Sequence, residues 1–361
     1  MRWTPCATVI ATIWTVGSTG ATDTLTARTL QEMKRRDEPI IRTGLSLNGK
    51  MREWSPLGDR KSIAGLARHS HFQFTCKRLT AIYDQTVEFF EEIPQRTEPT
   101  DPEAADRGFI YNKDGVQFFI FKARVRAFHQ RGFLNAVLRT TKSLYVEPDG
   151  RFGLSKAEGY ALELYPLDNL METMNRAWQV LLCSGRGYTF VIDHSSATSR
   201  KLADGLIEIR AKGREAPELP LYTGFFADEP TMGRNTVWLL VVDPKADYLV
   251  REATFFFLER EEPFIRIKTS GRLNLKGGAM IAKHGEYRLK PEVPYEELKV
   301  EFTKGEWRFS QAFYEEVRHA VLDPPDETSI LDNRFGDIPF TFTYRKAATG
   351  ATPDTNCSTN R

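Results

Sequence analysis

Residues 237–257 read VWLLVVDPKADYLVREATFFF, and this stretch decides the fold. An apolar run over 237–242 is followed by a turn at 243–247, where Asp and Pro are typical turn residues. A second run of bulky and β-branched residues begins directly after that turn. Because a connection this short cannot hold a crossover helix, the two runs are predicted to be neighbouring antiparallel strands.

Similar patterns occur along most of the chain. Polar and apolar residues alternate at 71–77, 205–211, 264–269 and 298–302, as in half-buried strands. The segment 108–122, GFIYNKDGVQFFIFK, predicts a hairpin with its turn at 112–115, and 143–155 repeats that design around Pro148, Asp149 and Gly150.

Three segments have helical spacing instead. They are 26–41, 167–183, with Gly185 and Gly187 as a stop, and 310–321, which Ser310 is predicted to cap. The pattern as a whole indicates the α+β class, with one broad antiparallel sheet and helices on one side of it.

Composition bounds the class of protein. The chain has 361 residues, with 50 Lys and Arg against 48 Asp and Glu. This near-balance lacks the basic excess of a nucleic-acid binder. A hydrophobic content of 41% with 25 Gly is ordinary for a globular protein and excludes disorder or collagen as the overall state.

The first residues have the order of a secretory signal peptide. Arg2 precedes an uncharged stretch over 6–16, and small residues at 17–21 come before the first acid, Asp23. We expect removal of 1–21 after Ala21 and a periplasmic or secreted protein, with a buried N-terminal helix as the alternative. No later run reaches the roughly 20 apolar residues of a membrane-spanning helix.

Removal of the signal peptide would leave Cys76, Cys183 and Cys357. One disulfide could form among them, but spacing does not assign it. The alternative is that Cys76 and Cys183 are small buried apolar residues. The tail 347–361 is small and polar and is predicted to be disordered.

Several predicted strands are apolar on both faces, which an open sheet with one wet face does not require. Either helices and loops cover both faces, or one face lines an apolar cavity that takes a ligand. The period of two places residues on shared faces in pairs. The candidate apolar wall consists of Phe119 and Phe121, Leu239 and Val241, Phe255 and Phe257, and Ile265 and Ile267.

Residues with catalytic or metal-binding chemistry form no complete motif. His69 and His71 have a spacing that a metal site could use, but no third ligand is evident. Asp193, His194 and Ser195 are the residue types of a hydrolase triad, yet adjacency is not the required geometry, and no G-x-S-x-G surrounds a serine. No catalytic residue, metal or cofactor is therefore predicted.

The C-terminal half resembles a known family. Four segments show the resemblance: 237–257, the strands ending in EYRL (286–289) and ELKVEF (297–302), and LDPPDETSILD (322–332). Together with 26–55 they resemble LolA-like periplasmic lipoprotein carriers, including planctomycete-type variants. The resemblance implies a large curved antiparallel sheet, a half-open barrel with helices packed on its concave side. It also implies an apolar concavity that receives acyl chains without catalysis.

These inferences combine into one expectation. Residues 22–346 would form a single LolA-like domain with insertions around 95–235. It would be a non-enzymatic protein whose partner is a lipid or lipoprotein acyl chain, with only transient contact with a membrane surface and no nucleic acid. Two alternatives are an envelope sensor or scaffold module that binds a protein partner, and an envelope hydrolase.

Overall fold

The computed structural model describes residues 24–56, 65–78, 80–93, 109–113, 116–130, 133–146, 157–166, 171–214, 236–257, 263–276, 279–289, 296–334 and 340–346. The predicted signal peptide 1–21, the predicted turn at 148–150 and the tail 347–361 lie outside these residues. No helix within the described ranges is long and apolar enough to cross a membrane.

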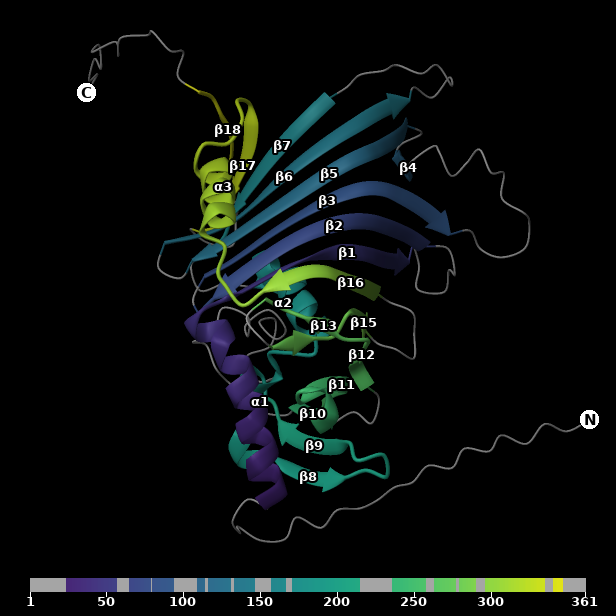
Figure 1. Cartoon of the computed structure of the whole chain (residues 1–361). Helices are drawn as coiled ribbons and strands as arrows, with labels where there is room; N and C mark the ends of the chain where they lie inside the picture. The colour runs from purple at the N-terminus through teal and green to yellow at the C-terminus, as the bar shows by residue number, and fades with distance from the viewer. Residues whose placement is uncertain are drawn as a thin grey trace, which may run out of the picture.

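Within the described residues, one sheet of 16 strands dominates the structure (Figure 1). Its order is β18-β17-β7-β6-β5-β3-β2-β1-β16-β15-β12-β11-β10-β9-β8, with β4 pairing to β5. The bounds are β1 Leu45–Pro56, β2 Gly65–Lys77, β3 Thr80–Ile93, β4 Phe109–Lys113, β5 Val116–Gln130, β6 Leu134–Val146, β7 Ala157–Leu164, β8 Thr198–Lys201, β9 Ile207–Lys212, β10 Thr236–Asp243, β11 Leu249–Phe257, β12 Pro263–Ser270, β15 His284–Leu289, β16 Glu296–Glu306, β17 Thr328–Asp332 and β18 Phe340–Tyr344. A separate small hairpin pairs β13 (Leu273–Asn274) with β14 (Met280–Ile281).

The strands predicted from alternation are confirmed, as is the β10–β11 hairpin from which the prediction started. Residues 95–235, predicted as inserted material, supply β4 to β9 to the same sheet. One pair differs from the antiparallel expectation, because β17 runs parallel to β7. β17 follows α3 in the chain and is not joined to β7 by a hairpin turn, so its pairing with β7 need not be antiparallel.

The three predicted helices are also present: α1 (Thr24–Arg42), α2 (Met171–Cys183) and α3 (Gln311–Leu322). Ser310 caps α3, since its hydroxyl accepts from the Phe313 N–H at 3.4 Å. Gly185 and Gly187 follow α2 with φ of +77° and +83°. Those left-handed conformations are cheap only for glycine, so the helix ends where the sequence predicted.

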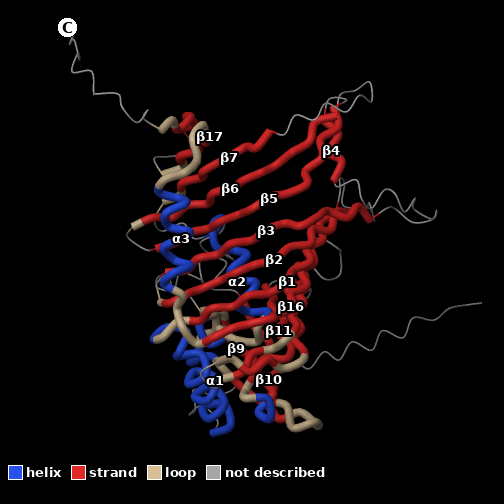
Figure 2. The backbone as a smooth tube through the Cα atoms, turned by 45° about the horizontal axis from the view of Figure 1, so that its top comes forward, coloured by secondary structure: helices blue, strands red, loops and turns tan. Residues whose placement is uncertain are grey.

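The sheet curves around α2. This helix contacts β3, β5 and β6 on one arm of the sheet and β12 and β15 on the other. We call the face that packs against α2 the inner face and the opposite one the outer face. Figure 2 shows α1 beside one end of the strands. The structure is therefore an open, strongly curved, mostly antiparallel α+β fold, as expected.

The position of α3 differs from the expectation that the helices lie on the concave side. Phe313, Val317 and Val321 of α3 pack with Ile82 of β3 and Phe128 of β5. The neighbouring residues on those strands face α2 instead, so α3 covers the outer face. The apolar stripe of α3 requires a sheet to pack on, but its spacing does not specify which face.

Candidate functional site on the inner face

The inner face presents an apolar row that crosses five strands. Leu240, Ala253, Ile267, Tyr287 and Leu298 lie opposite one another in the register of β10, β11, β12, β15 and β16. None of these residues is more than 2% exposed. A wall this continuous could bind an apolar ligand or serve as ordinary core, and what covers it decides between the two.

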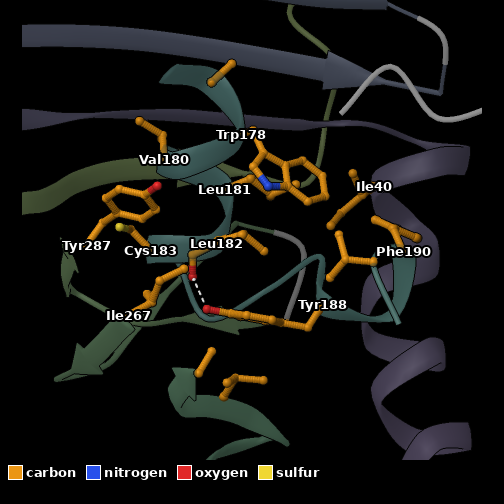
Figure 3. Packing of buried hydrophobic residues seen from close by; sticks show 14 of the residues in the cluster. Ile40, Trp178, Val180, Leu181, Leu182, Cys183, Tyr188, Phe190, Ile267 and Tyr287 are labelled. Carbon is orange, nitrogen blue, oxygen red and sulfur yellow. Dashed lines mark hydrogen bonds between the residues drawn. The ribbon is translucent and has the colours of Figure 1, made fainter. Parts of the chain in front are cut away.

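The protein's own side chains cover this wall in the structure (Figure 3). Trp178, Leu181, Leu182 and Cys183 of α2 are at most 1% exposed. Tyr188, in the turn after α2, donates its hydroxyl hydrogen to the Leu182 carbonyl at 3.1 Å (dashed in Figure 3). The concavity beneath the C-terminal half of α2 is therefore filled.

Polar groups instead hold the side of α2 that faces β1. Glu53 of β1 is buried, and its carboxylate lies 3.1 Å from the Arg176 guanidinium of α2. Gln85 of β3 donates to Glu53 at 3.0 Å and to the Ser70 hydroxyl at 2.9 Å. A buried acid is costly unless it is paired, so this pair adds a charged link between α2 and β1 to the packing of the helix on the sheet.

The turn after α2 is anchored much more firmly. Arg186 is 1% exposed and donates to the Met280 carbonyl at 2.8 Å and to the Asp247 carboxylate at 2.9 Å. Close by, Asp37 of α1 accepts from the Thr189 hydroxyl at 2.7 Å. Burial raises the pKa of Asp37, against the opposing effect of Arg186. One end of α2 is therefore fixed to α1 and to the β10–β11 turn.

A second charge pair on the inner face does not involve α2. Arg139 of β6 lies 2.8 Å from Glu163 of β7, and Tyr165 also donates to that carboxylate. Burial acts to raise the pKa of Glu163, but the hydrogen bonds from Arg139 and Tyr165 outweigh it and lower that pKa. This pair is a natural control for the Glu53–Arg176 pair.

The structure divides the predicted apolar wall. Phe255, Ile265 and Ile267 are fully buried on the inner face, and Phe257 joins them through a ring contact of 5.4 Å with Phe255. Leu239 and Val241 lie on the outer face, because the register pairs them with Thr254 and Glu252. Their inner-face counterparts are Trp238, Leu240 and Val242, which are buried.

The remaining two wall residues are on β5. Phe119 lies opposite Leu144 in the β5–β6 register, and Phe121 falls where that register shifts. The side chains of Phe119 and Phe121 are not among those that the structure describes. A ligand-binding role for the eight residues stays a prediction.

The residues of the incomplete metal and triad motifs contact other groups in the structure. His71 pairs with Glu88, and within the described ranges no group of His, Cys, Asp or Glu could hold a metal ion. Asp193 accepts from both the N–H and the hydroxyl of Ser195, while the His194 ring contacts the Thr189 carbonyl at 3.0 Å. The histidine therefore does not reach the serine, and this arrangement caps a turn.

The two buried cysteines match one of the alternatives left open by the sequence. Cys76 and Cys183 are both free and both buried. Burial raises the pKa of each thiol far above its ordinary value. Both behave as small apolar core residues.

Sequence reasoning missed the Glu53–Arg176 pair. Glu53 sits at an inner position of an alternating strand, and Arg176 lies on an amphipathic helix. An acid at an apolar position is a signal, but its partner is 123 positions away and can be found only from the structure.

Comparisons with known proteins give fold neighbours at low similarity. No protein-family model and no curated protein sequence matches the chain. A domain described as an outer membrane lipoprotein-sorting protein from Vibrio parahaemolyticus matches at 7% identity and a TM-score of 0.35, over 81% of this chain and 98% of that one. A DUF1329 family protein from Desulfovibrio piger matches at 9% identity and 0.38, with the same coverage. A β-barrel-like DUF1849 protein from Brucella abortus matches at 9% and 0.24, over 73% and 97%.

The lipoprotein-sorting domain is of the class that the sequence resemblance indicated. Because these TM-scores lie below 0.5, the matches carry no argument about function. The class defined by the coordinates themselves is an open, curved antiparallel sheet with a helix packed into its concavity.

Proposed function

We propose that this chain is an exported, non-enzymatic binding protein whose inner face takes up an acyl chain of a lipid or lipoprotein in place of α2. One observation carries the proposal. The apolar wall from β10 to β16 is covered by α2 and the turn that follows it; the helix is anchored at its C-terminal end and linked to β1 by one buried charge pair. Such a helix is suited to act as a lid.

The magnitudes allow this exchange. Displacing α2 exposes Trp178, Leu181 and Leu182, and each large apolar side chain loses roughly 1.5–3 kcal/mol of burial free energy. An acyl chain of about 16 carbons contributes roughly 0.8 kcal/mol for each methylene group it buries. Ala177, Val180 and Cys183 of α2 are buried as well, so the loss and the gain are of similar size. An acyl chain can therefore compete with the helix for the wall.

Lipid binding can be tested on the full chain purified from a native envelope. Mass spectrometry of the organic extract should find a bound lipid, and dansylaminoundecanoic acid should bind with a fluorescence increase. Glu53→Gln weakens the attachment of α2 to the sheet and should raise the probe's affinity severalfold. The matched control Glu163→Gln removes an inner-face acid that does not touch α2 and should leave that affinity unchanged.

Two results would contradict the proposal. One is an empty protein that ignores the probe both as wild type and as Glu53→Gln. The other is an equal response of the two variants, since the effect would then not depend on α2. Export is tested separately by N-terminal sequencing of the periplasmic fraction, which should begin at Thr22.

A second candidate function, a module that binds a protein partner, is favoured by one feature. The edge strand β18 exposes Phe340 and Phe342, which are 62% and 51% exposed. An exposed edge with aromatic side chains can accept a strand from another protein. Phe340→Thr with Phe342→Thr should abolish capture of an envelope protein by cross-linking, whereas the inner-face probe should still bind.

A further inference from the structure

The strands at the two ends of the sheet order, β8 and β18, are built differently. β8 is four residues long, includes Arg200 and Lys201, and packs against α1, where the Ser199 hydroxyl lies 2.7 Å from that of Thr26. A short edge with cations and a covering helix is one way in which sheets avoid pairing with other chains. In contrast, the five residues of β18, FTFTY, include no charge. This edge therefore lacks the protection that β8 has.

The aromatic side chains of β18 share the outer face of the sheet. Phe342 lies directly opposite Ile330 of β17, and Ile330 packs in the cluster that α3 covers. Phe340 and Tyr344, two positions to either side of Phe342, lie on the same face. The helix packs over β3, β5 and β6, and Phe340 and Phe342 are more than half exposed. The apolar outer face therefore continues past α3 and ends at an open edge.

The sequence of β18 matches itself when it is read in the opposite direction. Antiparallel pairing of two copies about Phe342 places Phe340 opposite Tyr344 of the second copy, and Thr341 opposite its Thr343. Aromatic residues then meet aromatic residues on the outer face, and threonines meet threonines on the inner face. Both kinds of cross-strand pair stabilise antiparallel sheets. The edge is thus complementary to a second copy of itself.

Charges do not oppose this pairing. Arg345 and Lys346 follow β18, so pairing about Phe342 places them at opposite ends of the two strands. The two copies of Arg345 are then six residues apart along the strands, about 20 Å. That separation exceeds the Debye length of about 8 Å at physiological ionic strength, so their repulsion is screened. Lys346 is already paired with Asp323 at 3.0 Å.

We infer that β18 pairs with β18 of a second copy of this chain, which joins two curved sheets into one. The inference rests on the second candidate function and names its partner. A two-fold axis through the strand pair gives both copies the same contact, so the interface closes and covers the open edge of each. Five residues on each side are fewer than the roughly 20–30 of a stable interface, so the dimer should be weak and depend on concentration.

Sedimentation velocity of the full chain over a wide range of concentration tests for the dimer. Wild type should shift from monomer to dimer as its concentration rises. Phe340→Thr with Phe342→Thr should weaken the dimer at least about tenfold, since aromatic pairs across the two-fold axis are lost. Phe133→Thr is the matched control, because it removes an exposed aromatic side chain from the turn between β5 and β6. It should dimerise as wild type does.

Cysteine cross-linking tests the register and keeps the aromatic side chains. In a chain carrying Cys6→Ser and Cys357→Ser, whose remaining cysteines are buried, Thr341→Cys and Thr343→Cys are prepared as separate proteins. Their mixture should form a disulfide-linked dimer on oxidation, because the two positions are directly opposite. Either protein alone should not, because its two cysteines are offset by two residues. Their Cα atoms would lie about 8 Å apart, beyond the roughly 7 Å limit of a disulfide.

Three results would overturn the inference: a wild type that stays monomeric over the whole range, equal weakening by the double variant and the control, and single-cysteine proteins that cross-link as well as their mixture. A monomer that still captures an envelope protein through β18 would overturn the inference and leave the second candidate function standing. The wall beneath α2 takes no part in this pairing. The fluorescent probe should therefore bind the monomeric variant as it binds wild type, and failure of acyl-chain binding would leave a dimer in place.

Discussion

A Cβ atom added to Gly285 of β15 would lie 2.4 Å from the Cβ of Cys183 in α2. It would also lie 2.5 Å from the Cys183 carbonyl oxygen. The C-terminal end of α2 therefore rests directly on the backbone of the sheet. Only glycine allows this approach, and it fixes how deeply the helix sits in the concavity.

Gly285→Ala should consequently force α2 away from β15. We expect a loss of about 1–3 kcal/mol in the free energy of unfolding, as for other overpacked cores, measured by urea denaturation. Gly159→Ala on β7 is the matched control, because the nearest atom to its added Cβ is the Thr141 carbonyl oxygen at 4.0 Å. Equal stability losses in the two variants would show that the close approach does not hold α2 in place.

The buried thiols should be inert in the native protein. Burial raises the pKa of Cys76 and Cys183, and the thiolate is the reactive form. In a chain carrying Cys6→Ser and Cys357→Ser, Ellman's reagent should detect no thiol until guanidinium chloride unfolds the protein. Rapid labelling under native conditions would disagree with the packing of α2, and mass spectrometry would identify which cysteine reacts.

Asp37 should make stability fall as pH rises above its ordinary pKa of 3.8. Burial raises the folded-state pKa of this acid, so the folded protein keeps a proton that the unfolded chain has already released. Stability attributable to Asp37 is then complete below the unfolded pKa and is lost as pH rises through the folded pKa. Asp37→Asn should flatten this part of the pH profile of urea midpoints.

Glu163 should affect the pH dependence of stability in the opposite direction. Burial acts to raise its pKa, but Arg139 and Tyr165 outweigh that effect and lower it, so its contribution is present above the unfolded pKa and lost on acidification. Glu163→Gln should therefore remove a stabilisation that wild type gains between acidic and neutral pH. If both variants shift the profile in the same direction, the assignment for Asp37 is wrong.

The N-cap of α3 should contribute measurably to stability. The Ser310 hydroxyl accepts from the Phe313 N–H, and Ser310→Ala should cost about 1 kcal/mol in thermal or urea denaturation. Ser329→Ala, at an exposed position of β17, is the control and should change stability little. A neutral Ser310→Ala would indicate that packing of Phe313 and Val317 alone holds the helix on the outer face.

Local patterns predicted the helices, strands and turns well, because these elements depend on residues that are neighbours in the chain. The turn after Val242, the alternation in β12 and β16, and the glycines after α2 each reflect a local backbone requirement. The same local patterns could not decide which of the candidate wall residues share one face of the sheet. Period-two spacing placed Leu239 with Val241 and Phe255 with Phe257, but the pairing of β10 with β11 decides that these two pairs face opposite sides.

The sequence by itself determined the α+β class, the strand-rich order and the three helices, because hydrophobic periodicity and turn chemistry act over a few residues. Only the tertiary structure decided that α2 fills the concavity, that α3 covers the opposite face, and that Glu53 pairs with Arg176. Each of these depends on register or on packing between segments far apart in the chain. An amphipathic stripe or a buried charged position indicates that some other segment packs against it, whereas the folded sheet determines which segment that is.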